Sequence, residues 1–77
     1  MEDLITLLIE PLVSDINKVR IEKQENGQNV TFNVFVPREE IAKVIGKEGK
    51  MVKSIKNLVK IRAIKQNIFA HVEVQEA

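Results

Sequence analysis

The sequence predicts an α+β fold in which three strands form a mixed sheet and helices cover one of its faces. Apolar residues recur at helical spacing in the first residues and again in the second half, and three other segments alternate apolar and polar residues. An Asn26-Gly27 pair lies between two of the alternating segments, where it favours a hairpin. The predicted order is α-β-β-α-α-β. A chain of 77 residues fits one domain, residues 1–77.

The first helix is expected over residues 3 to about 13. Pro11 predicts a kink or an early end, because proline lacks the N–H donor and clashes with the preceding turn. The apolar stripe of this helix is expected to consist of Leu4, Leu7, Leu8 and Leu12.

Two strands are expected next. Val19 and Ile21 alternate with charged residues and predict a half-buried strand. The turn at Asn26-Gly27 predicts that the following strand is antiparallel to it. The residues of that second strand expected to face the core are Val30, Phe32, Val34 and Val36.

Two helices separated by a short glycine turn are expected in the second half. Pro37 is expected to end the second strand and to lie in the first turn of a helix, with Glu39 and Glu40 near its positive end. That helix is expected to end at Gly46, and a longer helix to run from Gly49 to about Gln66. Its apolar stripe is predicted as Met51, Val52, Ile55, Leu58 and Val59.

A third strand is predicted after Asn67. Ile68, Ala70, Val72 and Val74 alternate there with polar or aromatic residues. A right-handed crossover through the two helices would make this strand parallel to the second one if the two are adjacent.

The charge of the chain is strongly asymmetric although the net charge is only +1. Residues 43–65 contain eight basic residues against Glu48 alone, a balance of +7, and the remaining residues have a balance of −6. Such a concentration of positive charge predicts a polyanionic partner on one face.

The glycine turn Gly46-Lys47-Glu48-Gly49 lies inside this basic segment. The first N–H groups of the helix that follows have no intrahelical acceptor, and together with the helix dipole they favour an anion. Glycine would let a phosphate backbone approach closely. Lys47, Lys50 and Lys53 add positive charge there, and Glu48 opposes it. A tight turn between helices with no ligand is the alternative.

The run Val44-Ile45-Gly46-x-x-Gly49-Lys50-x-Val52-x-x-Ile55 resembles the signature of the KH domain, a nucleic-acid-binding module. The element order resembles the bacterial type II KH arrangement, and the length resembles the small stand-alone bacterial KH proteins of the KhpA type. The resemblance implies that the loop clamps the backbone of about four nucleotides of single-stranded RNA. It also implies that Val44, Ile45 and Val52 line or support the adjacent base groove.

The resemblance further implies a cytoplasmic post-transcriptional regulator or RNA chaperone. Proteins of this kind self-associate as homodimers and pair with a larger KH protein that carries a second nucleic-acid-binding domain. At about 100° per residue, Ile61 and Ile64 fall opposite the predicted apolar stripe, so they are candidates for a partner interface. The alternative is that the helix distorts near its end and buries them.

A second hypothesis treats the chain as a protein-interaction adaptor whose glycine turn is only structural. Phe35 and Phe69 are expected on the outer face of the sheet, where they either cover each other across adjacent strands or form a second contact surface. The chain contains three Phe and no Tyr or Trp. This composition disfavours RNA-binding modules that stack bases on aromatic platforms.

Other function classes find little support. There is no cysteine, and His71 is the sole histidine, so no zinc site is predicted. No hydroxyl is expected near His71, and the glycine turn lacks the Gly-Lys-Ser/Thr ending of a nucleotide-hydrolysing loop. We therefore expect no enzyme, cofactor or small-molecule substrate. The apolar run 4–9 is too short to span a membrane.

Overall fold

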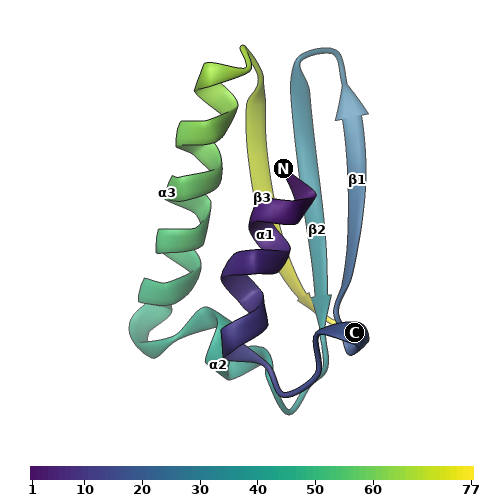
Figure 1. Ribbon diagram of the computed structural model, residues 1–77, viewed down its shortest axis with the longest axis vertical. Coiled ribbons are helices and arrows are strands. Elements are labelled where there is room, and N and C mark those ends of the chain that lie inside the picture. The colour runs from purple at the N-terminus through teal and green to yellow at the C-terminus, as the bar shows by residue number, and fades with distance from the viewer.

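The computed structural model describes residues 1–77 and has the predicted order of elements. The strands pair in the order β1-β2-β3, with β1 antiparallel to β2 and β3 parallel to β2 (Figure 1). The predicted mixed sheet is therefore confirmed. The helices are α1 (Glu2–Ile9), α2 (Ile41–Ile45) and α3 (Lys50–Lys65), and the strands are β1 (Arg20–Asn26), β2 (Asn29–Val36) and β3 (Phe69–Glu76). Short 3₁₀ turns are η1 (Glu10–Leu12), η2 (Ile16–Lys18) and η3 (Lys47–Gly49).

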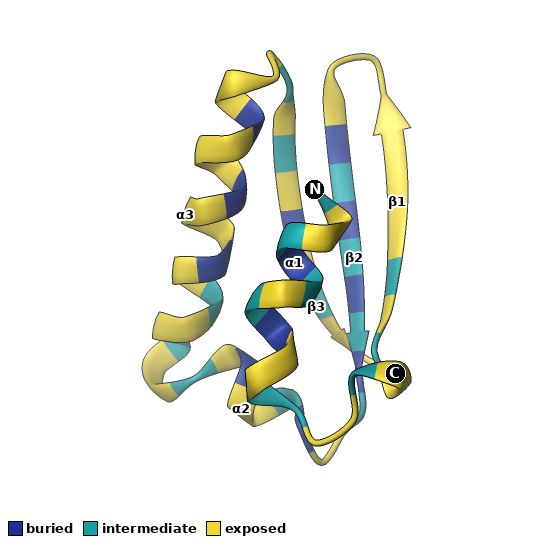
Figure 2. Cartoon of the chain, in the orientation of Figure 1, coloured by how far each residue is buried: buried dark blue, intermediate teal, exposed yellow.

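The core lies between the helices and one face of the sheet, centred on β2. Burial alternates along β2, as a strand with one covered face requires, whereas β1 is almost entirely exposed (Figure 2). The helix α3 buries one residue per turn against the sheet. The buried apolar residues are Ile5, Ile9, Val30, Phe32, Val34, Val36, Val44, Ile55, Val59, Ala63 and Val72.

The stripe predicted for α1 is confirmed for Leu4, Leu8 and Leu12, which are partly buried against the core, but the most buried residues of this helix were not among those predicted. Ile5 and Ile9 are fully buried, whereas Leu7 is 67% exposed. The prediction was wrong for Leu7 because it lies about 200° around the helix from Ile5. The α-helix ends at Ile9, and Pro11 lies in the 3₁₀ turn that follows, which confirms the early end expected from this proline.

The helix α2 begins later than predicted. Pro37 lies outside it, in a turn closed by a hydrogen bond of 2.9 Å from the N–H of Glu40 to the carbonyl of Pro37. The carboxylate of Glu40 does not cap the helix. It turns to the segment after α1, where it accepts hydrogen bonds from the N–H of Ser14 (2.8 Å) and from the Ser14 hydroxyl. This contact fixes the start of α2 against the first part of the chain.

Two members of the predicted apolar stripe of α3 are exposed. Leu58 is 46% and Met51 is 38% exposed, while Ile55, Val59 and Ala63 are buried. The burial shows that the sheet-facing side of α3 is centred near Val59, about 100° from Leu58. The prediction was wrong for Leu58 because the apolar residues of this helix spread over more of its circumference than the sheet covers.

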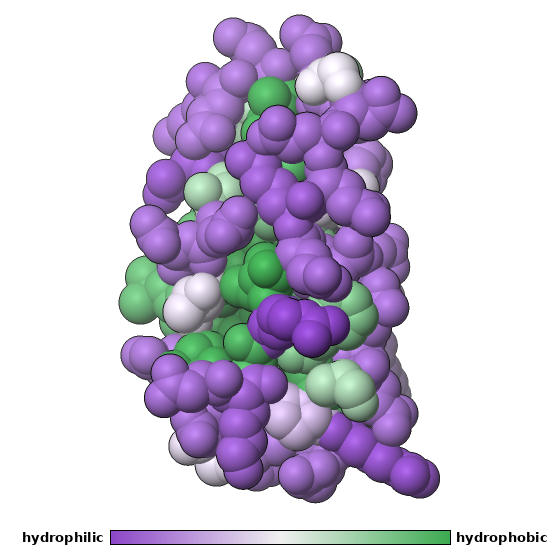
Figure 3. Space-filling view, turned by 90° about the vertical axis from the view of Figure 1, so that its right-hand side faces the viewer, coloured by the Kyte–Doolittle hydropathy of each residue, from purple (hydrophilic) through white to green (hydrophobic).

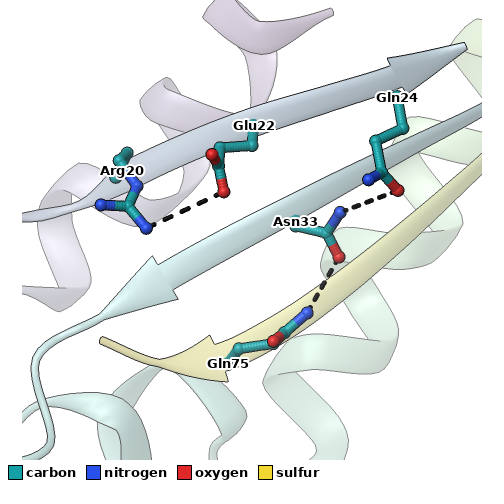
Figure 4. A network of polar contacts seen from close by, with 5 residues as sticks. All are labelled: Arg20, Glu22, Gln24, Asn33 and Gln75. Carbon is teal, nitrogen blue, oxygen red and sulfur yellow. Dashed lines mark hydrogen bonds and ion pairs between the residues drawn. The ribbon is translucent and has the colours of Figure 1, made fainter.

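The opposite face of the sheet carries no helix and is largely polar. The side-chain amide of Asn33 donates to Gln24 on β1 (3.5 Å) and accepts from the amide of Gln75 on β3 (2.9 Å), so it links all three strands (Figure 4). Arg20 approaches Glu22 at 3.8 Å in the same figure. Such a face needs no covering layer.

On the β1 side, Figure 3 shows apolar surface at mid-height between polar regions.

Phe35 and Phe69 do not cover each other. Phe69 is opposite Asn29 at one end of β2, whereas Phe35 is opposite Gln75 near the other end. The parallel register of β2 and β3 separates them by six residues along β2, about 20 Å. Phe35 instead lies beneath the guanidinium of Arg20, 4.6 Å from the ring centroid. The predicted cross-strand pair is therefore wrong, and Phe69 remains exposed.

Candidate nucleic-acid interface

The turn between α2 and α3 has a backbone conformation that depends on glycine. Gly46 has φ 77° and ψ 175°, and Gly49 has φ 75° and ψ 12°. Both lie in regions that L side chains rarely adopt, and the region of Gly46 is essentially confined to glycine. Glu48 between them also has a positive φ of 57°. The glycines adopt these conformations readily, so the backbone strain of the turn lies at the exposed Glu48.

Close contact adds a second requirement at Gly46. A Cβ atom there would lie 2.6 Å from the Cβ and 3.0 Å from the backbone nitrogen of Met51. At Gly49 the nearest neighbour of such a Cβ would be a methyl group of Val52 at 4.0 Å. Gly46 thus lets α2 and α3 meet closely, while the space beside Gly49 is open to a ligand.

The loop exposes backbone and positive charge together. Gly49 is the N-cap of α3 and has no side chain that could accept hydrogen bonds from the first N–H groups of that helix. Lys47, Lys50 and Lys53 are all exposed within two turns of it. The three ion pairs of the structure involve Arg20, Lys23 and Arg38, so none engages a basic residue of the 43–65 segment. All eight of these cations are available to an external anion.

The three aliphatic residues predicted beside the loop have different positions. Val44 is fully buried, so it can support a groove only from behind. Ile45 is 37% exposed and Val52 is half-buried, so both are accessible to a ligand.

A groove runs along α3 on the side where β3 has no neighbouring strand. A hollow of about 200 Å³ there is lined by Lys56, Asn57 and Lys60 of α3 and by the β3 segment 70–73. These residues were not predicted as part of the site. The strand order is the signal that identifies them. A third strand that pairs with β2 alone lies at the edge of the sheet, and α3 then borders its unpaired side.

The open edge of β3 presents backbone hydrogen-bonding groups to this hollow. Phe69 donates its N–H to Gln28 (2.8 Å) and Ala77 donates to Val36 (2.9 Å), so the odd-numbered residues of β3 bond toward β2. Since successive residues of a strand point their N–H and C=O groups to opposite sides, those of Ala70 and Val72 face the open edge. The edge therefore offers alternating donors and acceptors beside a row of lysines.

The two candidate interface residues are exposed, as predicted. Ile61 is 56% and Ile64 is 65% exposed, so the helix does not distort to bury them. Together with Leu58 they form an apolar ridge on the solvent side of α3, which we call the α3 ridge. Apolar residues so exposed and so close together are typical of a contact surface.

The family of the chain follows from a match over nearly its whole length. The profile of the KH domain of KhpA and KhpB matches residues 2–74. The chain belongs to the KhpA/KhpB family of KH domains. A curated RNA-binding protein KhpA of Listeria monocytogenes is 37% identical over 59 residues, which are 77% of this chain and 78% of that protein. An RNA-binding protein KhpA of Chlamydia pneumoniae is 29% identical over 76 residues, 99% and 97% of the two chains.

A solved structure agrees on the fold. A crystal structure of an Aquifex aeolicus Era variant bound to GDP and AlF₄⁻ superposes on 96% of this chain with a TM-score of 0.64. The sequence identity is 15% and the match covers 29% of the Era chain, so the likeness concerns the fold alone. Membership of the KhpA/KhpB family and the strand order together establish the type II KH fold.

The remaining chemistry of the surface is limited. No three His, Cys, Asp or Glu side chains gather in a way that could hold a metal ion. No helix is both long enough and apolar enough to cross a bilayer. His71 is exposed at the β3 edge, where it lines the hollow described above.

Proposed function

We propose that this KH domain binds single-stranded RNA along the groove between α3 and the open edge of β3. One observation carries the proposal: eight basic residues that form no ion pair extend from the glycine turn along α3, and Lys56 and Lys60 among them line that groove. The names of the KhpA relatives point to the same ligand class. Residues 1–77 would act as one module.

The glycine loop and the lysines beside it would contact the phosphate backbone. In the loop Gly46–Gly49, the N–H groups of Lys47 and Glu48 would hold the phosphate backbone, since those of Gly49 and Lys50 already donate to the carbonyls of Gly46 and Lys47. Lys47, Lys50 and Lys53 would add point charges to these contacts, and Glu48 would oppose them. This part of the site recognises the anionic backbone and does not distinguish one base from another.

Base contacts would lie next to the loop. Ile45 and Val52 offer apolar surface, with Val44 behind them, and the free N–H and C=O groups of Ala70 and Val72 can meet the hydrogen-bonding edges of unpaired bases. In a duplex the Watson–Crick edge of each base is occupied by its partner, whereas an unpaired base can offer this edge to the strand, so the groove suits single strands.

The proposal includes a partner. A single module with few phosphate contacts binds weakly, and joining two of them raises the effective affinity without new contacts. The α3 ridge supplies a surface for such pairing, either with a second copy or with a larger KH protein that carries another nucleic-acid-binding domain. A cytoplasmic role as post-transcriptional regulator or RNA chaperone would follow. The same ridge supports the second candidate, an adaptor that binds protein only.

The experiment is a titration of a fluorescein-labelled single-stranded RNA of about eight nucleotides, followed by anisotropy at several salt concentrations. If Lys47, Lys50 and Lys53 each neutralise one phosphate, log affinity should fall with log salt at a slope of about −2. Replacement of Lys53 by Ala should reduce the slope by about 0.7.

The control is Lys18→Ala, which removes an exposed lysine outside the 43–65 segment. The slope should be unchanged in this variant. An absence of salt-dependent binding, or equal effects of the two lysine replacements, would favour the adaptor over the RNA-binding module.

A further inference from the structure

The largest hollow of the surface lies at the end of α3 farthest from the glycine loop. It has a volume of about 440 Å³ and is lined mostly by apolar residues from the last turns of α3 and the first residues of β3. Ile64 of α3 and Phe69 of β3 both line it, and these two are 65% and 62% exposed. Lys60 and His71 supply its polar lining. Water therefore covers a concentration of apolar side chains here.

The exposure of Phe69 follows from the topology. Its partner on β2 is Asn29, and no strand pairs with β3 on the other side. No neighbouring side chain therefore covers the ring. The chain turns into β3 through Asn67, which has φ 57°, and the N–H groups of Asn67 and Ile68 return to the last carbonyls of α3. This closed turn holds Phe69 beside Ile64. The backbone that carries the exposed ring is thus held in place by hydrogen bonds.

The Phe69 hollow continues the groove that leads from the loop. Lys60, Ala70 and His71 line both this hollow and the one beside Lys56 and Asn57. A strand gripped at the loop and running along the β3 edge would therefore arrive at Phe69. The lysines of α3 accompany this path and match the charge of a phosphate backbone.

We infer that Phe69 is a stacking platform for a nucleobase that lies beyond the nucleotides held by the glycine loop. The inference rests on the proposed RNA binding and deepens it. A base is flat and aromatic and carries a phosphate on the same unit, which fits an aromatic ring with Ile64 beside it and Lys60 at its edge. The small number of aromatic residues disfavoured base stacking in the sequence analysis. A count of residues, however, does not show that one of the three phenylalanines lies exposed beside this groove.

The test uses the absence of Trp and Tyr from the chain, which makes Phe69→Trp the sole strong fluorophore. Phe35→Trp is the matched control, because it lies on the same face of the sheet near the other end of the β2–β3 pair. Each variant is titrated with unlabelled single-stranded RNA of about four and about eight nucleotides. The longer RNA should quench the emission of Phe69→Trp and leave that of Phe35→Trp unchanged.

A second variant measures the contribution to affinity. Phe69→Ser should weaken binding of the longer RNA about fivefold to tenfold, at the lower end of what one stacked base contributes, and should leave the shorter RNA unaffected. Because Phe69 is exposed, neither variant removes a core contact.

Three results would overturn the inference, and they separate it from the proposed function. If the RNA binds by anisotropy but the emission of Phe69→Trp does not change, the platform is refuted and the RNA-binding module stands. If neither RNA binds, both fail. If the emission of Phe69→Trp changes with protein concentration alone and RNA has no further effect, a second copy of the chain occupies the hollow instead.

Discussion

The carboxylate of Glu40 accepts two hydrogen bonds from Ser14, one from its N–H and one from its hydroxyl. The two residues are 26 positions apart in sequence. Glu40 is also the one buried charged residue of the chain. Because α2 has only five residues, this contact at its start lies one short helix away from the glycine loop. It therefore helps to position the loop from the opposite end of α2.

Stability should depend on pH through this contact. The hydrogen bonds from Ser14 lower the pKa of Glu40 below its ordinary value of 4.5, and Lys43 and Lys18 act in the same direction. A carboxyl whose folded pKa is lowered stabilises the fold above its unfolded pKa and loses this effect as the pH falls through the folded pKa. Between pH 7 and about pH 3, the urea midpoint of the wild type should fall more than that of Glu40→Gln. Equal falls in the two proteins would refute the role of the contact.

Gly46 should tolerate substitution less well than Gly27. Both have positive φ, but a Cβ at Gly27 would meet nothing within 4 Å, whereas one at Gly46 would collide with Met51. Gly27→Ala should cost about 1–2 kcal/mol in the free energy of unfolding, the cost of the left-handed conformation alone. Gly46→Ala should cost at least about 1 kcal/mol more. Urea denaturation measures both, and similar losses would contradict the close contact of α2 with α3.

Replacement of Glu48 by Asn should improve RNA binding. The change removes the one negative charge of the loop, and asparagine tolerates the positive φ found there. A unit charge about 4 Å from a phosphate costs about 1 kcal/mol in water, so affinity should rise at most about fivefold. Anisotropy titration at low salt is the measurement. Weaker binding by this variant would show that Glu48 contacts RNA favourably.

The core position of α3 can be tested with a pair of neighbouring residues. Ile55 is 2% exposed and Leu58 is 46% exposed. Ile55→Ala should reduce the free energy of unfolding by about 2–5 kcal/mol, because it leaves a cavity beneath the helix. Leu58→Ala should change it by less than about 1 kcal/mol. If both variants lose the same stability in urea, the helix is rotated from the orientation described above.

Self-association should depend on the α3 ridge. Ile61→Asp places a charge on this ridge without touching the core, so it should lower the mass measured by light scattering toward that of one chain. Leu7→Asp is the control, since Leu7 is also an exposed aliphatic residue (67%, against 56% for Ile61) but lies on α1. An oligomer that keeps its mass in the Ile61 variant, or loses it in both variants, would place the interface elsewhere.

The sequence was sufficient for the order of elements and the directions of the strands. The Asn26-Gly27 turn determines the antiparallel pair, and the crossover through two helices determines the parallel one. Gly46 and Gly49 also marked the turn correctly. These features depend on local chemistry and on chain handedness, both of which can be inferred from residues close in sequence.

What the sequence could not supply depends on contacts between distant segments. In α1, isoleucines and leucines surround most of the helix, so spacing alone could not tell that Ile5 and Ile9 face the sheet. The start of α2 depends on the contact between Glu40 and Ser14. The groove itself needed the knowledge that β3 lies at an edge, which places Lys56 and Lys60 beside its free backbone groups.

The lysines along α3 have a consequence for solubility. An unpaired strand edge is a template for another strand, and proteins commonly protect such edges with lysine. The edge formed by β1 carries alternating charges of its own, from Arg20 to Glu25, whereas the apolar half of β3 relies on Lys56 and Lys60 of the neighbouring helix. Variants that remove these two lysines should therefore lose protection against edge-to-edge aggregation along with affinity for a polyanion.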